Sequence, residues 1–189
     1  MRQTKSTQIA TLAIFFATMI VIDILSSVIF NLLPVPIKPT IVHIPVIVAS
    51  ILYGPKIGAT LGGMMGILSV VHNTIMLLPT SYLFSPFVEN GQWYSLVVAI
   101  LPRILIGVTP YFIYRLSQKR LGLLISGAIG SLTNTVFVLG SIFFLFSSVY
   151  NGNIQAMLAT IIGTNSIAEM LIAAFLTVAI VPTLQKAKK

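Results

Sequence analysis

Apolar residues dominate the chain in six long stretches, which short polar or proline-containing segments separate. The stretches cover residues 7–31, 42–54, 56–78, 93–116, 121–149 and 153–184. A helix needs about 20 mostly apolar residues to cross the hydrocarbon core of a bilayer. All but the second stretch reach that length. The pattern therefore predicts six membrane-crossing helices, with the short second helix tilted, sheltered by its neighbours, or paired with the third as a helical hairpin.

The composition indicates that lipid surrounds most of the protein. Of the 189 residues, 57% are hydrophobic and 7% are charged, whereas an ordinary soluble domain is about 25% charged. So few charges cannot cover a water-facing surface. We therefore predict an all-α integral membrane bundle, a single membrane-embedded domain over residues 1–189. The apolar stretch at 9–33 is too long for the core of a signal peptide and is interpreted as a retained first helix.

The basic residues gather at the ends of the apolar stretches, which predicts the orientation of the chain. With six crossings both termini lie on one side, and that side also receives most of the lysines and arginines. They are Arg2, Lys5, Lys56, Arg115, Lys119, Arg120, Lys186, Lys188 and Lys189. Only Lys38 falls in a loop on the other side. The positive-inside rule then predicts that both termini are cytoplasmic. The net charge of +8 is therefore interpreted as a sign of membrane orientation and of attraction to anionic lipid, not of nucleic-acid binding.

Ionisable residues inside the apolar stretches are the first candidates for function, because burying them in a bilayer is costly. Arg103 lies near the middle of the fourth stretch, and Glu169 lies in the sixth, one helical turn after Asn165. A guanidinium can hold a carboxylate or a phosphate with two parallel hydrogen bonds. Arg103 is therefore expected either to anchor an anionic ligand or to form an internal ion pair with Glu169 or Asp23.

Further polar candidates occur in the third and fifth stretches and at the start of the fourth. His72 and Asn73 fall in the outer half of the third stretch and Asn134 near the middle of the fifth. Asn134 is expected to contact a ligand or to link two helices by a hydrogen bond. His72 is expected to act as a hydrogen-bonding group, because too few other metal ligands are present for a metal site. Trp93 is a ligand-contact candidate or a marker of the membrane interface.

Small residues form two stripes at helical spacing. The third stretch carries Gly58, Gly62 and Gly66, and the first carries an alanine stripe consisting of Ala10, Ala13 and Ala17. Small residues let another helix approach closely. Either stripe can serve packing inside the bundle or docking of a partner.

The first outer loop, at residues 32–41, is stiffened by prolines, which favour extended backbone. It is interpreted either as a simple connector or as a gate over a cavity. The gate residues are Pro34, Pro36, Lys38 and Pro39.

The sequence lacks the motifs of common catalytic sites. It contains no phosphate-binding loop of the Gly-x-x-x-x-Gly-Lys-Ser/Thr type, no Gly-x-Ser-x-Gly elbow and no His-Glu-x-x-His helix. Without cysteine, thiolate catalysis and zinc-thiolate sites are excluded. The chain is therefore expected not to be an enzyme and to hold no cofactor. A stand-alone secondary transporter stays open as a competing class, although its usual internal repeats are not apparent.

Several motifs spread over the chain resemble the substrate-binding S components of energy-coupling factor (ECF) vitamin transporters. They are Ala13-x-x-x-Ala17, Tyr53-Gly54-Pro55-Lys56-x-Gly58-Ala59, Pro102-Arg103-Ile104-Leu105-Ile106-Gly107 and Gly130-Ser131-Leu132-Thr133-Asn134-Thr135. The resemblance implies a multi-pass protein of the bacterial cytoplasmic membrane that binds a vitamin near the extracellular side. It also implies a transmembrane coupling subunit, docked on the alanine stripe, and two cytoplasmic ATPases that use ATP and magnesium.

The combination of Phe84-Ser85-Pro86-Phe87 with Pro102-Arg103 and Thr133-Asn134-Thr135 most resembles the branch linked to pantothenate. Carriers for pyridoxine or hydroxymethylpyrimidine are the nearest alternatives. Pantothenate has a carboxylate for Arg103, and its hydroxyls and amide suit Asn73, Asn134 and Asn165. The resemblance thus predicts a vitamin site built from Arg103, Asn134, His72, Asn73, Asn165, Glu169 and Trp93.

Overall fold

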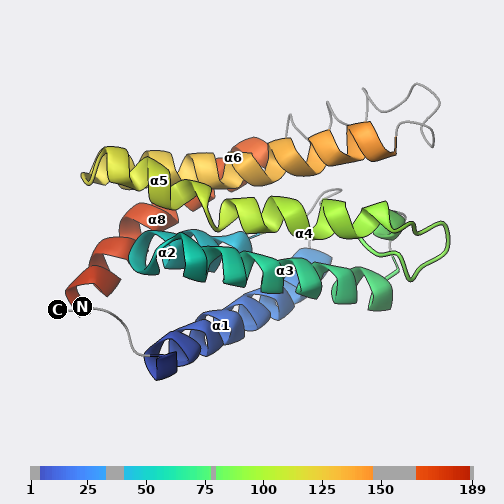
Figure 1. Ribbon diagram of the computed structural model, residues 1–189, viewed down its shortest axis with the longest axis horizontal. Coiled ribbons are helices and arrows are strands. Elements are labelled where there is room, and N and C mark those ends of the chain that lie inside the picture. Colours follow the sequence, from blue (N-terminus) through green and yellow to red (C-terminus); the bar gives the residue numbers. More distant parts are fainter. Residues whose placement is uncertain (1–4, 33–40, 78–79, 147–164, 188–189) are drawn as a thin grey trace.

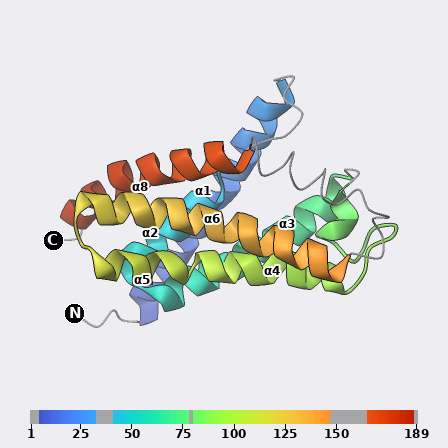
Figure 2. The same ribbon diagram turned by 90° about the horizontal axis from the view of Figure 1, so that it is seen from above.

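The computed structural model describes residues 5–32, 41–77, 80–146 and 165–187, and all regular secondary structure in these segments is helical. The helices are α1 (Lys5–Leu32), α2 (His43–Tyr53), α3 (Pro55–Ile75), α4 (Tyr94–Ile106), α5 (Thr109–Leu116), α6 (Arg120–Leu145) and α8 (Ile167–Ala187), with a short 3-10 helix, η1 (Ser81–Leu83). Figures 1 and 2 show them packed as a bundle with α1 crossing one side at an angle. The prediction of an all-α bundle is confirmed for the described residues.

Within the described residues, four segments are both long and apolar enough to cross a membrane. They are Lys5–Ile29, Tyr94–Leu116, Arg120–Leu145 and Ile167–Ala187. Helix α3 has 21 residues, about 31 Å at 1.5 Å per residue, and its glycines lower its hydropathy. Helix α2 has only 11 residues, about 16 Å, so it reaches through roughly half of a hydrocarbon core. The prediction that the second span is short is confirmed.

Helix α2 forms the centre of the bundle. Nine consecutive residues, from His43 to Ile51, are buried. Because other helices surround it on all sides, α2 reads as a continuous apolar run rather than as an amphipathic pattern. At its end, Gly54 adopts a φ of 96°, which favours glycine, and Pro55 starts α3 directly afterwards. The two helices thus form the tight hairpin that the sequence suggested.

Helices α3 and α4 approach each other at backbone distance. A Cβ atom added at Gly62 would lie 2.0 Å from the carbonyl oxygen of Arg103, and one added at Gly58 would lie 2.0 Å from the carbonyl oxygen of Gly107. At Gly66 the added atom would meet the backbone of Ile100 at 2.8 Å. The glycine stripe therefore serves packing inside the chain, and it fixes the height and the direction of α4.

The fourth predicted stretch is divided into α4 and α5 by a turn at Gly107 and Val108. Pro110 has no N–H to bond the carbonyl four residues earlier, which weakens a continuous helix at this point. The break also lets Gly107 sit against Gly58.

The described basic residues other than Arg103 lie at the ends of helices, and these ends are at one end of the bundle. Figure 1 places the start of α1, the α2–α3 turn, the α5–α6 turn and the end of α8 together at that end. Lys5, Lys56, Arg115, Lys119, Arg120 and Lys186 all belong to these segments. The opposite end carries η1 and the loop that follows it (Figure 1).

Candidate functional site

Arg103 lies in the interior of the bundle on α4. Its side chain is only 8% exposed. The Nη1 atom donates a hydrogen bond of 2.8 Å to the carbonyl oxygen of Val98, and the guanidinium carbon lies 5.2 Å from the centre of the Phe84 ring. Because Val98 is five residues nearer the outer end of α4, the guanidinium is directed toward that end. It is a buried, positively charged group held from two sides.

The Nε atom of Arg103 is buried and has no hydrogen-bond partner within the described part of the chain. Buried polar groups in proteins are nearly always paired, so such an atom calls for an explanation. Nε and a terminal nitrogen of a guanidinium form one edge of the planar fork that can hold a carboxylate. Arg103 therefore has the chemistry to bind an anionic ligand in addition to its contacts with Val98 and Phe84.

Glu169 supplies the opposing charge from α8. It is 7% exposed and attracts the guanidinium of Arg103 electrostatically. Asn165 lies directly before α8, one turn from Glu169, and is half-buried. The expected association of Arg103 with Glu169 is thus present as an attraction across the bundle. Asp23, the other expected ion-pair partner of Arg103, lies instead against His72.

Asn134 lies on the face of α6 that points into the bundle. That face also carries Ser131 and Val138, at spacings of three and four residues, and both are buried. The Oδ1 atom of Asn134 and the Oγ atom of Ser131 are buried without a hydrogen-bond partner among the described residues. Sequence reasoning missed Ser131, although its position three residues before Asn134 could have identified it.

Two contacts hold this face of α6 in place. The hydroxyls of Thr109 and Thr133 lie 3.3 Å apart and join α6 to the start of α5. On the other side, a Cβ added at Gly127 would lie 2.6 Å from the carbonyl oxygen of Ala173, so α6 and α8 pack closely. Helices α4, α6 and α8 therefore surround an interior that contains one buried cation, one buried carboxylate and several unpaired polar atoms.

The segment after η1 covers the outer end of this interior. The hydroxyls of Thr74 and Ser85 are 2.7 Å apart, and Ser95 donates a hydrogen bond of 2.6 Å to the carbonyl oxygen of Tyr82. The Tyr82 ring also packs edge-on against Phe146, with ring centres 6.1 Å apart. These contacts hold the segment against α3, α4 and the end of α6, and they place Phe84 against Arg103.

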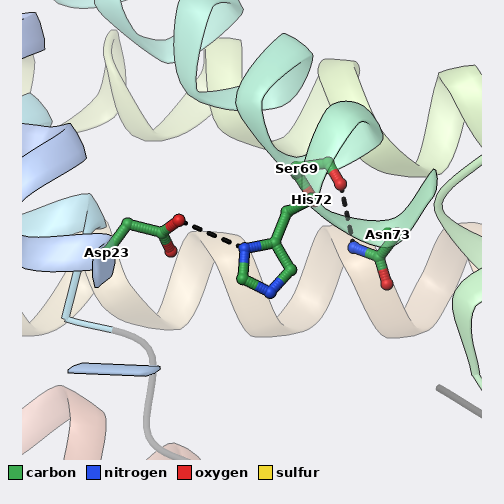
Figure 3. A network of polar contacts seen from close by, with 4 residues as sticks. All are labelled: Asp23, Ser69, His72 and Asn73. Atoms are coloured by element: carbon green, nitrogen blue, oxygen red, sulfur yellow. Dashed lines mark hydrogen bonds and ion pairs between the residues drawn. The ribbon is translucent and has the colours of Figure 1, made fainter. Parts of the chain in front are cut away.

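His72 and Asp23 join α3 to α1. Nδ1 of His72 lies 3.2 Å from Oδ2 of Asp23, and the two side chains are 30% and 27% exposed (Figure 3). Asn73 points away from this pair and donates to the carbonyl oxygen of Ser69 at 2.9 Å (Figure 3). It also accepts a hydrogen bond of 3.3 Å from Ser81. The predicted hydrogen-bonding role of His72 is confirmed. Its partner is Asp23 on α1.

The remaining predicted residues lie at the surface or outside the described segments. Trp93 is 74% exposed, as expected for a residue that marks the membrane interface rather than one that lines a buried site. Ala10, Ala13 and Ala17 are all exposed on α1, so this stripe is not used for packing within the described chain. The proposed gate residues Pro34, Pro36, Lys38 and Pro39 lie outside the described residues. No group of three or more potential metal ligands occurs among the described residues.

Comparison with known proteins gave two matches that cover most of the chain. A sequence model of the family described as "ECF transporter, substrate-specific component" matches residues 7–181. The pantothenic acid transporter PanT of Lactococcus lactis subsp. cremoris is 44% identical over 193 residues, which include 100% of this chain and 98% of the relative. Both matches include α4, α6 and the part of α8 that carries Glu169.

Proposed function

This chain belongs to the family of ECF transporter substrate-specific components, and from this premise we propose that it is the pantothenate-binding subunit of an ATP-driven vitamin importer. It is a multi-pass protein of the cell membrane and a transport component rather than an enzyme. The observation that carries the choice of vitamin is the full-length identity of 44% to a pantothenic acid transporter. A buried guanidinium whose Nε atom has no hydrogen-bond partner among the described residues supports the choice, because pantothenate is an anion.

In this proposal each polar group of the interior has a role. Arg103 binds the carboxylate of pantothenate, since charge-assisted hydrogen bonds are strong in a water-poor site. Asn134 and Ser131 offer their unpaired oxygens to the hydroxyl and amide hydrogens of the vitamin. Glu169 balances the charge of Arg103 when the site is empty. Phe84 positions the guanidinium and closes the outer side of the chamber.

A neutral vitamin such as pyridoxine or hydroxymethylpyrimidine is the second candidate. The attraction between Glu169 and Arg103 favours it, because a fully neutralised guanidinium would have no need of an anionic ligand. Competition separates the two candidates. Radiolabelled pantothenate bound to the purified chain should be displaced by unlabelled pantothenate and not by either neutral compound at equal concentration.

The chain is proposed to cross the membrane six times with both termini in the cytoplasm and to form one domain over residues 1–189. The gathering of the described basic residues at one end of the bundle supports this orientation. Because the chain contains no cysteine, single cysteines can be introduced and labelled without background. A cysteine at Lys119 should react with an impermeant maleimide only after the cells are opened, whereas one at Glu89 should react in intact cells.

Energy for import is proposed to come from other polypeptides, a transmembrane coupling subunit and two ATPases that use ATP and magnesium. The exposed alanine stripe supports a docking role, because small residues on a lipid-facing helix allow close approach of a partner. The loop with Pro34, Pro36, Lys38 and Pro39 is proposed as the gate of the site.

Reconstitution tests the division of labour. Proteoliposomes that contain this chain alone should bind pantothenate without accumulating it, and accumulation should appear when the coupling subunit, the ATPases and internal ATP are added. Accumulation by the chain alone would contradict the proposal and identify a self-sufficient secondary transporter.

A further inference from the structure

A groove with a volume of about 440 Å³ runs between α1, α2 and α8, away from Arg103. Its walls are apolar side chains such as Phe15 and Ile22 on α1, Val48 on α2 and Ile180 on α8. Only two lining residues from the membrane-embedded helices carry aliphatic hydroxyls, and both hydroxyls bond within α1. Thr11 donates to the carbonyl oxygen of Thr7 at 2.8 Å, and Thr18 donates to that of Ile14 at 2.9 Å. The groove thus offers little to a polar ligand and suits a hydrocarbon chain.

The length of the groove matches one leaflet of a bilayer. On α1 the lining residues extend from Thr11 to Ile22, a rise of eleven residue steps or about 16 Å of helix. The hydrocarbon core of a bilayer is about 30 Å thick, so one leaflet contributes about 15 Å. On α8 the lining ends at Leu184, close to the end of the helix. The groove therefore lies in the leaflet on the side where α1 begins and α8 ends.

Exposed lysines stand at that end of the groove. Lys186 follows the lining residue Leu184 by two positions, and Lys56 follows the lining residue Tyr53 across the α2–α3 turn. Lys5 begins α1 at the same end of the bundle (Figure 1). The three acidic residues of the chain lie elsewhere, as Asp23 pairs with His72, Glu89 belongs to the segment after η1, and Glu169 is buried in the first turn of α8. The end of the groove is therefore positively charged without compensation.

An apolar channel one leaflet long, with a cationic end at the membrane surface, has the shape and the charge of an anionic phospholipid. We propose that this groove is a binding site for one such lipid, whose acyl chain lies between α1, α2 and α8 and whose headgroup lies against Lys56 and Lys186. The lipid would fill the space that α1 leaves open against the rest of the bundle. It would thereby hold α1, which carries the alanine stripe, in a defined position.

Native mass spectrometry of the full chain in a mild detergent tests the site. Phosphatidylglycerol and phosphatidylcholine with identical acyl chains are added separately, and the lipid that stays bound is counted. One phosphatidylglycerol should be retained per chain, with a preference over phosphatidylcholine of about fivefold for each lysine near the headgroup. Equal retention of the two lipids would overturn the proposal.

Two pairs of variants separate this site from unspecific lipid. Lys56→Gln with Lys186→Gln should abolish the preference for phosphatidylglycerol, whereas Lys119→Gln with Arg120→Gln, which removes the same charge at the α5–α6 turn, should keep it. If both pairs of variants lost the preference for phosphatidylglycerol equally, the proposal would be overturned, because the preference would then reflect net charge alone.

Blocking the groove provides the second test. Thr18 is an exposed lining residue, and Val21 is an α1 residue 54% exposed outside the lining. Thr18→Trp should lose the retained lipid while Val21→Trp keeps it, with equal helix content of both variants measured by circular dichroism. Retention in Thr18→Trp would overturn the proposal. A second outcome would also overturn it: the unchanged chain retains no lipid, and Thr18→Trp prevents assembly with the coupling subunit. The groove would then be occupied by a helix of the partner.

Discussion

Replacing Arg103 by alanine should weaken pantothenate binding strongly while leaving a neutral analogue almost unaffected. A hydrogen bond to a charged group contributes about 1.5–3 kcal/mol. The structure favours the upper end, because alanine would leave the Glu169 carboxylate buried beside the bound anion without its counter-charge. We therefore expect a loss of about 3 kcal/mol, or about 150-fold in Kd. Isothermal titration of the purified chain with pantothenate measures this loss.

Panthenol, in which an alcohol replaces the carboxylate of pantothenate, is the matched ligand. It should bind the unchanged chain more weakly than pantothenate, and Arg103→Ala should alter its affinity by less than about 0.5 kcal/mol, the usual limit for independent effects. Arg103→Lys keeps the charge but loses the planar fork, so its affinity for pantothenate should lie between that of the unchanged chain and that of Arg103→Ala. An equal loss for both ligands would mean that Arg103 supports the fold through Val98 and Phe84. Unchanged pantothenate affinity would remove Arg103 from the site.

Three further changes test the packing around the site. Gly62→Ala places a Cβ about 2.0 Å from the carbonyl oxygen of Arg103 and should cost about 1–3 kcal/mol in thermal unfolding, whereas Gly63→Ala, with its nearest contact at 3.8 Å, should be neutral. Equal stability of the two variants would contradict the α3–α4 contact. Ala13→Trp should keep pantothenate binding and abolish ATP-driven uptake, and joint loss would indicate a packing role instead. A double-mutant cycle with Asp23→Asn and His72→Gln should give a coupling of about 0.6 kcal/mol in unfolding, and zero coupling would mean that the pair does not hold α1.

Much of the fold could be predicted from the sequence because a bilayer permits few solutions. Long apolar stretches must become helices in lipid, so the helical type of the elements follows from hydropathy. The glycine stripe likewise identified a tight helix contact. Its partner could not be predicted, since spacing shows only that a face is smooth and not which helix it meets. The break between α4 and α5 escaped prediction for a similar reason, because it depends on Gly107 meeting Gly58 as well as on Pro110.

The candidate site was predicted less completely. Arg103, Asn134 and Glu169 stood out because charged and amide side chains are rare in apolar stretches, and all three face the interior. The residue types of Phe84 and Ser131 gave no signal, since phenylalanine and serine are common in membrane helices and loops. Only the position of Ser131, three residues before Asn134, could have identified it. His72 and Asp23 were each identified as polar, but their contact joins residues 49 positions apart. Only the angle at which α1 crosses α3 brings them together.

The small molecule that the protein carries from the cell tests the central claim most directly. The chain should be purified alone, without coupling subunit or ATPases, from cells supplied with several vitamins, and then denatured so that mass spectrometry can identify what it releases. Pantothenic acid should be released in a ratio approaching one molecule per chain, and its amount should fall sharply in Arg103→Ala. Release of pyridoxine or hydroxymethylpyrimidine, or of no vitamin at all, would contradict the account.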